Sequence, residues 1–468
     1  ALAGGKNGEV IIPGQALESS LWKLVESDKM PKKRAALSKE EKKRLREWID
    51  SGATWAGDEI DPLAHVRDKR AGGTWLQRLT VSEYIETVRD SLGVDVTKEA
   101  REILPRDQRA DGFSNTAYNL TVDLKHVESY ARLARIIVEK MDVLKFSARF
   151  SKKQKLIDDD MRELIAKMGR WILRGPLEER EVVSYRGIST TVASAGGDFR
   201  ECVELMIEAM LQSPRFIYRV ENQRGDGQLW PTGDYELASR LSYILWGSSP
   251  DEELLRAAGA GKLADRDFLS AQVRRMLGDP RARRQSARFI DEWLDLGRLE
   301  NMAPSRKLFP GWTRELARDM RRETLAFFDD VVWQQNRPFW DLLNAQVTFA
   351  TPRLAKHYGL VPLGKGLERY DLSAVPGRGG LLTQGSLLSI GGDEASMVTR
   401  GLFILTELLR GSVKDPPPGT DTTPVPARPG LTKRAISEKR VADASCGGCH
   451  SKFEPLAFGL EKYDGLGS

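Results

Sequence analysis

Residues 79–93 read LTVSEYIETVRDSLG and contain every signal that starts and stops a helix. Thr80 and Glu83 have the spacing of a capping box, in which each side chain accepts a hydrogen bond from the backbone N–H of the other residue. Leu79 and Tyr84 flank this cap as a hydrophobic staple. Apolar residues then recur with the helical period as far as Gly93, and glycine favours the left-handed conformation that ends many helices. The stretch therefore predicts an amphipathic helix.

Similar signals recur along most of the chain. A helical apolar pattern ends at Gly247, and Ser249-Pro250 predicts the next helix start, with serine as the cap and proline in the first turn. Asp279-Pro280 repeats this pattern. Strand signals are sparse, with candidates at 347–350 and 378–383. Because the local signals agree with one another, the sequence predicts a mainly α fold.

The composition limits the classes of protein to which this chain can belong. It has 468 residues, with 72 Lys and Arg against 67 Asp and Glu, so the net charge is only +5. The arginines of residues 274–289 alternate with apolar residues at helical spacing, which indicates a solvated helix face rather than a nucleic-acid surface. No apolar run approaches the roughly 18 residues that a membrane helix needs. We therefore expect neither nucleic-acid binding nor a transmembrane segment.

Two of the three cysteines lie in Cys446-Gly447-Gly448-Cys449-His450. The pattern CxxCH is the attachment motif of c-type haem. Its two thiols add to the porphyrin vinyl groups, and the histidine that follows is placed to bind the iron. Glycines between the thiols let the backbone turn tightly beneath the ring. We predict one covalent haem c, attached through Cys446 and Cys449 and bound at its iron by His450.

Other interpretations of the cysteine pair explain less of the sequence. A thioredoxin-like redox pair belongs in a βαβ unit, whereas residues 414–430, upstream of the pair, hold six prolines and predict an extended tether. A structural zinc site needs four ligands, and there is no second CxxC or HxxxH. A disulfide remains open, but it leaves His450 without a role. Cys202 has the helical spacing of a core residue, on one stripe with Leu205 and Met206.

The second axial ligand of this iron is not evident. No Met or His follows His450 in the sequence, so the ligand is either outside this sequence, supplied from elsewhere or absent. Met397 and His357 are conceivable donors. We expect the chain to turn at Pro455 so that a carbonyl oxygen accepts from the imidazole N–H of His450 and orients the ring.

A second haem-like signal lies in residues 1–57. Met30 stands next to a proline, in a polar loop before a helix that Ser38 and Glu41 start with a capping box. This arrangement is typical of the distal-ligand loop and last helix of a class I cytochrome c, where a thioether raises the reduction potential. We predict Met30 as an iron ligand, the alternative being packing against Trp48. No CxxCH precedes Met30, so the module as given cannot attach haem covalently.

The remaining sequence offers little further chemistry. It contains no GxxxxGK[ST], no GxGxxG after a strand, no HExxH and no GxSxG. The acidic runs at 158–160 and 329–330 have the character of solvated helix ends. No catalytic residue can be named, and whether the chain is an enzyme stays open.

Eight longer strings of residues, spread over nearly the whole chain, resemble those of one protein family. They are LQRLTVSEYIETVRDSLG at 76–93, DGFSNTAYNLTV at 111–122, GPLEERE at 175–181, SPRFIYRVE at 213–221, YELASRLSYILWGSSPDEELL at 235–255, RLAKHYGL at 353–360, RGGLLTQGSLL at 378–388 and CGGCHSKFEPLAFGLEKYDGLG at 446–467. With these strings the chain resembles the planctomycete-type cytochrome c proteins, which carry a cytochrome c module followed by the domains of unknown function 1587, 1595, 1592 and 1588.

The resemblance implies a multi-domain helical body flanked by a partial class I cytochrome c module and a C-terminal CxxCH haem segment. The implied domains are the C-terminal part of a cytochrome c module at 1–57, a 1587-like domain at 74–145, a 1595-like domain at 150–197, a 1592-like domain at 198–335 and a 1588-like domain with the proline-rich tether and CxxCH at 336–468. It also implies a piece of a longer chain, truncated at both ends, whose full length carries a second haem c.

The expected function is electron transfer outside the cytoplasm. We predict a periplasmic or otherwise extracytoplasmic haem protein that exchanges electrons with a redox partner protein, with the helical domains as scaffold or docking surface. One alternative is a haem-dependent oxidase or peroxidase-like enzyme acting on an extracytoplasmic, polysaccharide-derived substrate. Another is a cell-surface binding protein, associated with the surface or with polysaccharide, in which haem is structural.

Overall fold

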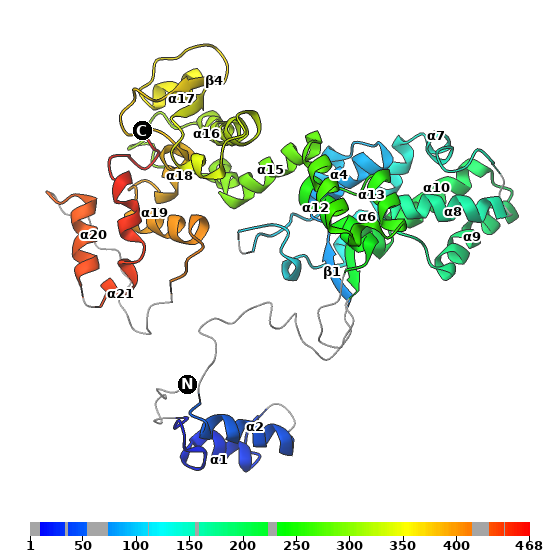
Figure 1. Ribbon diagram of the computed structural model, residues 1–468, viewed down its shortest axis with the longest axis horizontal. Helices are drawn as coiled ribbons and strands as arrows, with labels where there is room; N and C mark the ends of the chain where they lie inside the picture. The colour runs from blue at the N-terminus through cyan, green and yellow to red at the C-terminus, as the bar shows by residue number, and fades with distance from the viewer. Residues whose placement is uncertain are drawn as a thin grey trace. The chain divides into compact units, whose positions relative to one another are not determined.

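The structure is a computed structural model of the chain. It describes residues 10–32, 36–53, 74–110, 112–154, 159–222, 232–413, 430–443 and 445–468. The chain divides into two compact units, a smaller one of residues 1–73 and 224–230 and a larger one of residues 74–223 and 231–468. Helices dominate both units (Figure 1), which confirms the mainly α prediction. Among the described helices, none is long and apolar enough to cross a membrane. Nearly all of the predicted tether at 414–430 lies outside the described residues.

In its described residues, 10–32 and 36–53, the smaller unit contains two helices and a 3-10 turn around a small apolar core. Its elements are η1 (Ala16–Glu18), α1 (Ser20–Glu26) and α2 (Lys39–Asp50). The predicted capping box is present, because Ser38 Oγ accepts from the Glu41 backbone N–H at 3.2 Å and Glu41 Oε2 accepts from the Ser38 backbone N–H at 2.8 Å. Trp22 and Ile49 lie in the core of this unit. Met30 is half-buried, and its backbone N–H donates to the Leu24 carbonyl at 3.1 Å.

The larger unit begins with a helical body. Its helices are α4 (Val81–Leu92), α5 (Thr97–Ile103), α6 (Leu124–Lys140), α7 (Val143–Ser147), α8 (Asp159–Ile172), α9 (Glu179–Ser194), α10 (Phe199–Leu211), α11 (Pro214–Ile217), α12 (Asp234–Trp246), α13 (Glu252–Gly259), α14 (Arg266–Leu277) and α15 (Pro280–Trp293). Helix α10 packs against α6, α7 and α9, and α8 packs against α9 (Figure 1). One continuous apolar core joins these helices with α4.

Helix α4 forms as its sequence predicts. Thr80 Oγ1 accepts from the Glu83 backbone N–H at 3.1 Å, and Glu83 Oε2 accepts from the Thr80 backbone N–H at 2.8 Å. Leu79 and Tyr84 are both fully buried beside this cap. Gly93 ends the helix in the left-handed conformation, with φ of 74°.

Cys202 is fully buried on α10, which confirms its predicted core position. Burial raises the pKa of its thiol to about 11. The prediction that Leu205 shares the buried stripe of Cys202 is wrong, because Leu205 is 41% exposed. The core instead covers the side of the helix that carries Val203, Met206, Ile207 and Met210. Leu205, three residues after Cys202, lies on the side of Cys202 away from Val203 and Ile207. Its side chain therefore points away from the buried face.

Later helix starts follow the predictions in part. Asp279 caps α15 with Pro280 in its first turn, and Gly247 closes α12 at a φ of 63°. The predicted Ser249 cap is wrong: α13 begins at Glu252, and its cap is Asp251, whose Oδ1 accepts from the Leu254 backbone N–H at 2.9 Å. Pro250 therefore precedes the helix instead of occupying its first turn.

The rest of the larger unit combines one long helix, α16 (Arg314–Phe328), with shorter elements. The shorter elements are a π-helical turn η5 (Asp329–Gln334), α17 (Pro352–His357), η7 (Leu381–Thr383), α18 (Gly385–Leu388), α19 (Met397–Phe403), η9 (Ile404–Leu408), α20 (Lys433–Ala442), α21 (Gly447–His450) and η10 (Glu454–Leu460). Short 3-10 turns η2 (Ala117–Asn119), η3 (Lys262–Ala264), η4 (Leu296–Asn301), η6 (Phe339–Leu343) and η8 (Ser389–Gly391) connect the helices. The prediction of a solvated helix end at 329–330 is wrong for Asp330, which is 2% exposed, because the chain continues there into η5.

The described residues of the unit also form two antiparallel strand pairs. Strand β1 (Thr74–Arg78) pairs with β2 (Tyr218–Asn222), and β3 (Val347–Ala350) pairs with β4 (Glu368–Asp371). The predicted strand at 347–350 is confirmed. The strand predicted at 378–383 is wrong, because Gly380 adopts a φ of 70° and a side chain there would collide with the Leu343 carbonyl. The chain turns instead into η7.

Removing the Thr80 side chain is expected to destabilise the larger unit. Thr80→Ala deletes the hydroxyl that accepts from the Glu83 N–H, so the free energy of unfolding should fall by about 1–2 kcal/mol in urea denaturation. Thr190→Ala is the matched control, because Thr190 is exposed and its hydroxyl donates only to a carbonyl of its own helix. The control should change stability by less than about 0.5 kcal/mol. Equal effects of the two substitutions would contradict the assignment.

Candidate functional site: the CxxCH segment

The CxxCH motif forms one turn of helix, α21, between α20 and η10. Asp443 organises its start: Asp443 Oδ1 accepts from the backbone N–H of Ser445 at 2.8 Å and from that of Cys446 at 3.1 Å. The hydrogen bond from the Ser445 hydroxyl, together with these two backbone hydrogen bonds, lowers the pKa of the Asp443 carboxyl to about 2. A side chain at Gly447 would collide with the Val441 carbonyl. The motif therefore needs glycine at Gly447 for close approach of the backbone.

Both thiols of the motif are unpaired and half-buried. Cys446 and Cys449 are three residues apart along a helical turn, a spacing that places their side chains on one face. No disulfide joins them in the structure. Within the described parts of the chain, no group of three or more His, Cys, Asp or Glu side chains is arranged to hold a bare metal ion. The arrangement suits attachment to one planar group beside the turn.

A buried carboxylate orients His450. The imidazole Nδ1 lies 2.5 Å from Glu454 Oε1, and Glu454 is completely buried. An ionised carboxylate only accepts, so Nδ1–H donates to it. Within the described chain, His450 Nε2 has no hydrogen-bond partner. The predicted orienting group, a backbone carbonyl near Pro455, is therefore replaced by the neighbouring carboxylate.

These residues fit a covalently attached haem. The site offers two accessible thiols on one face of a helical turn and an imidazole with Nδ1 held and Nε2 free, which is the donor set that such a group requires. Phe453 is buried beside the imidazole, with ring centroids 5.0 Å apart.

Arg400 attaches the residues after the motif to the rest of the unit. Helix α19 packs against η10, and the buried Arg400 guanidinium donates to the carbonyl oxygens of Leu388, Leu460, Tyr463 and Asp464. Burial lowers the pKa of Arg400 to about 10. A side chain at Gly401 would collide with the Phe453 carbonyl, so α19 and η10 are in close contact.

A second arginine anchors the end of the chain. Arg378 stacks on the Tyr358 ring at 3.9 Å and donates to the carbonyl oxygens of Thr383 and Gly467. His357 Nε2 lies 2.9 Å from the Leu466 carbonyl, so this nitrogen contacts the backbone of the C-terminal segment. Burial lowers the pKa of His357. His357 has a structural role in this arrangement.

Glu323 lies beneath these residues as a buried acid. The Tyr358 hydroxyl donates to Glu323 Oε2 at 2.6 Å, and the Thr348 hydroxyl donates to Oε1. Burial raises the pKa of the Glu323 carboxyl to about 7, and the two hydroxyl hydrogen bonds offset only part of this effect. Glu323 is thus a pH-sensitive group in the core that supports the C-terminal segment.

The other candidate residues are placed elsewhere. The structure brings Cys446, Cys449 and His450 together in the larger unit, whereas Met30 belongs to the smaller one. Met397 is buried at the first position of α19. Sequence reasoning missed Glu454, although a carboxylate four residues after a helical histidine is a signal that could have identified it.

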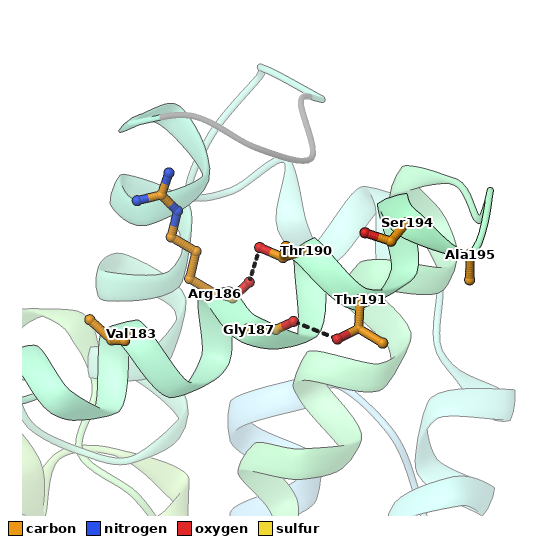
Figure 2. Close-up of a pocket in the computed structure, with 7 residues that line it drawn as sticks. All are labelled: Val183, Arg186, Gly187, Thr190, Thr191, Ser194 and Ala195. Carbon is orange, nitrogen blue, oxygen red and sulfur yellow. Dashed lines mark hydrogen bonds between the residues drawn. The ribbon is translucent and has the colours of Figure 1, made fainter.

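Helix α9 carries a shallow depression that is separate from this segment. Figure 2 shows Val183, Arg186, Gly187, Thr190, Thr191, Ser194 and Ala195 around it. The hydroxyls of Thr190 and Thr191 donate to the carbonyls of Arg186 and Gly187 at 3.2 and 2.9 Å, so they bond to their own helix. The depression therefore lacks convergent polar groups and is no candidate active site.

Four domain models match the chain. In chain order they are PSD3, protein of unknown function DUF1587, at 77–143; PSD5, DUF1595, at 160–221; PSD4, DUF1592, at 233–360; and PSCyt3, DUF1588, at 378–468. This is the order that the resemblance predicts, and the CxxCH motif lies within the last match. No curated protein and no solved structure matches the chain.

Glu323 is expected to make stability depend on pH. Its pKa is raised from 4.5 to about 7, so the folded chain keeps a proton that the unfolded chain releases. The free energy of unfolding should therefore fall by about 3 kcal/mol as pH rises from about 4.5 to about 7, and Glu323→Gln should remove this fall. Urea denaturation at about pH 5 and about pH 8 measures it. Glu394→Gln, at an exposed glutamate, should retain the wild-type slope; an unchanged slope in Glu323→Gln would contradict the assignment.

Proposed function

Because this chain belongs to the planctomycete-type multidomain cytochrome c family, we propose that it is an electron-transfer protein with haem c attached at the CxxCH segment. One observation carries the proposal. Two accessible thiols share one face of a helical turn, and the histidine that follows them is held by a buried carboxylate through Nδ1, leaving Nε2 free. This arrangement supports an iron ligand better than a disulfide or a bare metal site.

Each residue of the segment has a role in this function. Cys446 and Cys449 hold the haem, which supplies an iron that alternates between two oxidation states. His450 offers Nε2 to the iron, and Glu454 orients the imidazole. Asp443 fixes the start of the turn through its hydrogen bonds to the Ser445 and Cys446 amides.

The smaller unit is the second part of the proposal. We assign Met30 as a thioether ligand to the iron of a second haem c. Support comes from its half-buried position in the loop that leads to the capped helix α2. A thioether ligand favours ferrous iron and would raise the potential of that haem.

The remaining parts of the proposal concern compartment and partner. Haem c is attached outside the cytoplasm, so a periplasmic or otherwise extracytoplasmic location follows from the proposed cofactor. The only other thiol, Cys202, is fully buried and does not compete for attachment. The helical body serves as scaffold or docking surface for a redox partner protein.

Covalent haem is the first measurement. With the chain expressed alongside a cytochrome c maturation system, a pyridine haemochrome spectrum should show one haem c per chain. Cys446→Ala combined with Cys449→Ala should abolish covalent haem, because both thioether bonds are lost. Cys202→Ala is the matched control and should keep full haem content. A colourless wild-type protein would overturn the proposal.

The ligation state separates electron transfer from haem catalysis. An electron-transfer site should exchange electrons rapidly with small mediators and should show a low-spin spectrum that added cyanide changes little. A high-spin spectrum with rapid cyanide binding would instead support the peroxidase-like alternative, because it reveals an open iron position. Absence of any electron exchange would favour a structural haem.

A further inference from the structure

Glu454 is an ionisable side chain in an unusual setting. It is completely buried, and its two oxygens accept from three donors on other residues. Oε1 accepts from His450 Nδ1 at 2.5 Å and from Arg440 Nη1 at 2.8 Å, while Oε2 accepts from the Ser437 hydroxyl. Burying a carboxylate is costly unless it is paired and hydrogen-bonded, and here both requirements are met.

Two of the three donors come from one helix. Ser437 and Arg440 are three residues apart on α20, so they face Glu454 from the same side of that helix. Their hydrogen bonds hold the carboxylate in place without help from His450. Ser437 is fully buried and the Arg440 side chain is 17% exposed, whereas the His450 side chain is 26% exposed at the edge of the site. The carboxylate is therefore the fixed partner, and the imidazole is the group that it positions.

We propose that Glu454 is a positioning residue that fixes the Nδ1–H tautomer of His450 and increases the electron density at Nε2. The inference rests on the proposed function and extends it, since it states which oxidation state the site favours. A carboxylate acceptor raises the basicity of a ligating imidazole more than a neutral carbonyl does. A more basic ligand stabilises ferric iron, so Glu454 lowers the reduction potential of the haem at this site.

Arg440 limits the strength of this effect. It shares Glu454 Oε1 with His450, so part of the negative charge is neutralised at the oxygen that the imidazole contacts. The Glu454 carboxylate and the Arg440 guanidinium therefore have opposing effects on the imidazole, and both act at Glu454 Oε1. Removing the carboxylate and removing the arginine should move the potential in opposite directions, which a purely structural role of Glu454 does not predict.

The apoprotein gives a test that needs no haem. Free neutral imidazole prefers the Nε2–H tautomer, whereas the contact with Glu454 demands Nδ1–H. NMR of the ¹⁵N-histidine-labelled apoprotein above neutral pH should show His450 mainly as Nδ1–H in the wild type and mainly as Nε2–H in Glu454→Gln. Glu454→Asp keeps the charge but withdraws the carboxylate by one methylene, so it should also lose the Nδ1–H preference. A wild-type tautomer in both variants would overturn the proposal.

The potential of the loaded protein gives the second readout. Redox titration should show a higher midpoint potential in Glu454→Gln and a lower one in Arg440→Gln. Glu461→Gln is the matched control, because it removes the same charge seven residues away, where the carboxylate accepts from the Arg434 backbone N–H instead of from His450. Equal shifts of the potential in Glu454→Gln and Glu461→Gln would mean that any lost negative charge near the haem has the same effect. That result would overturn the proposal. Haem content is measured in parallel: loss of covalent haem from the wild type would count against the proposed function, whereas full haem content with unchanged potentials would count only against the role of Glu454.

Discussion

The buried guanidinium of Arg400 is the constraint on which the arrangement of the C-terminal segment depends. It donates to backbone carbonyls of one earlier turn, at Leu388, and of three later residues that follow the CxxCH motif. The Leu460 and Asp464 carbonyls also accept from the backbone N–H groups of Tyr463 and Gly467 at 3.3 Å. A buried carbonyl without a donor is costly, so the Arg400 side chain supplies hydrogen bonds that this irregular segment lacks.

The position of each group in the site depends on the group before it, beginning with Arg400. Arg400 holds the residues after η10, and the close packing of α19 at Gly401 sets the position of Phe453 and Glu454. Helix α20 then supplies the donors that fix the Glu454 carboxylate. The carboxylate in turn orients His450 beside the two thiols. Each step positions the next, so the chemistry depends on packing distant from the motif.

The helical body is held together by apolar packing and by buried hydrogen bonds. Its core includes one apolar cluster that joins α4, α6, α8 and α10 and a second that joins α12, α13 and α14. Many of its buried polar groups bond within the fold, as the Thr87 and Tyr243 hydroxyls do at 2.9 Å. The depression on α9 has hydroxyls that bond to their own helix. A stable helical body of this kind is what the proposed scaffold role requires.

The sequence by itself determined the local features: the capping boxes at Ser38 and Thr80, the glycine stop at Gly93, and the proposed attachment residues of the CxxCH turn. These depend on interactions within about four residues, which a local pattern records. Tertiary structure alone decided the pairing of β1 with β2, the burial of Asp330 and the outward direction of Leu205. The spacing of His450 and Glu454 is local, but tertiary structure decided that Glu454 is the buried acceptor, because its burial depends on α20 and α19 packing against η10. No local pattern records these packing contacts, since they join residues far apart in the chain.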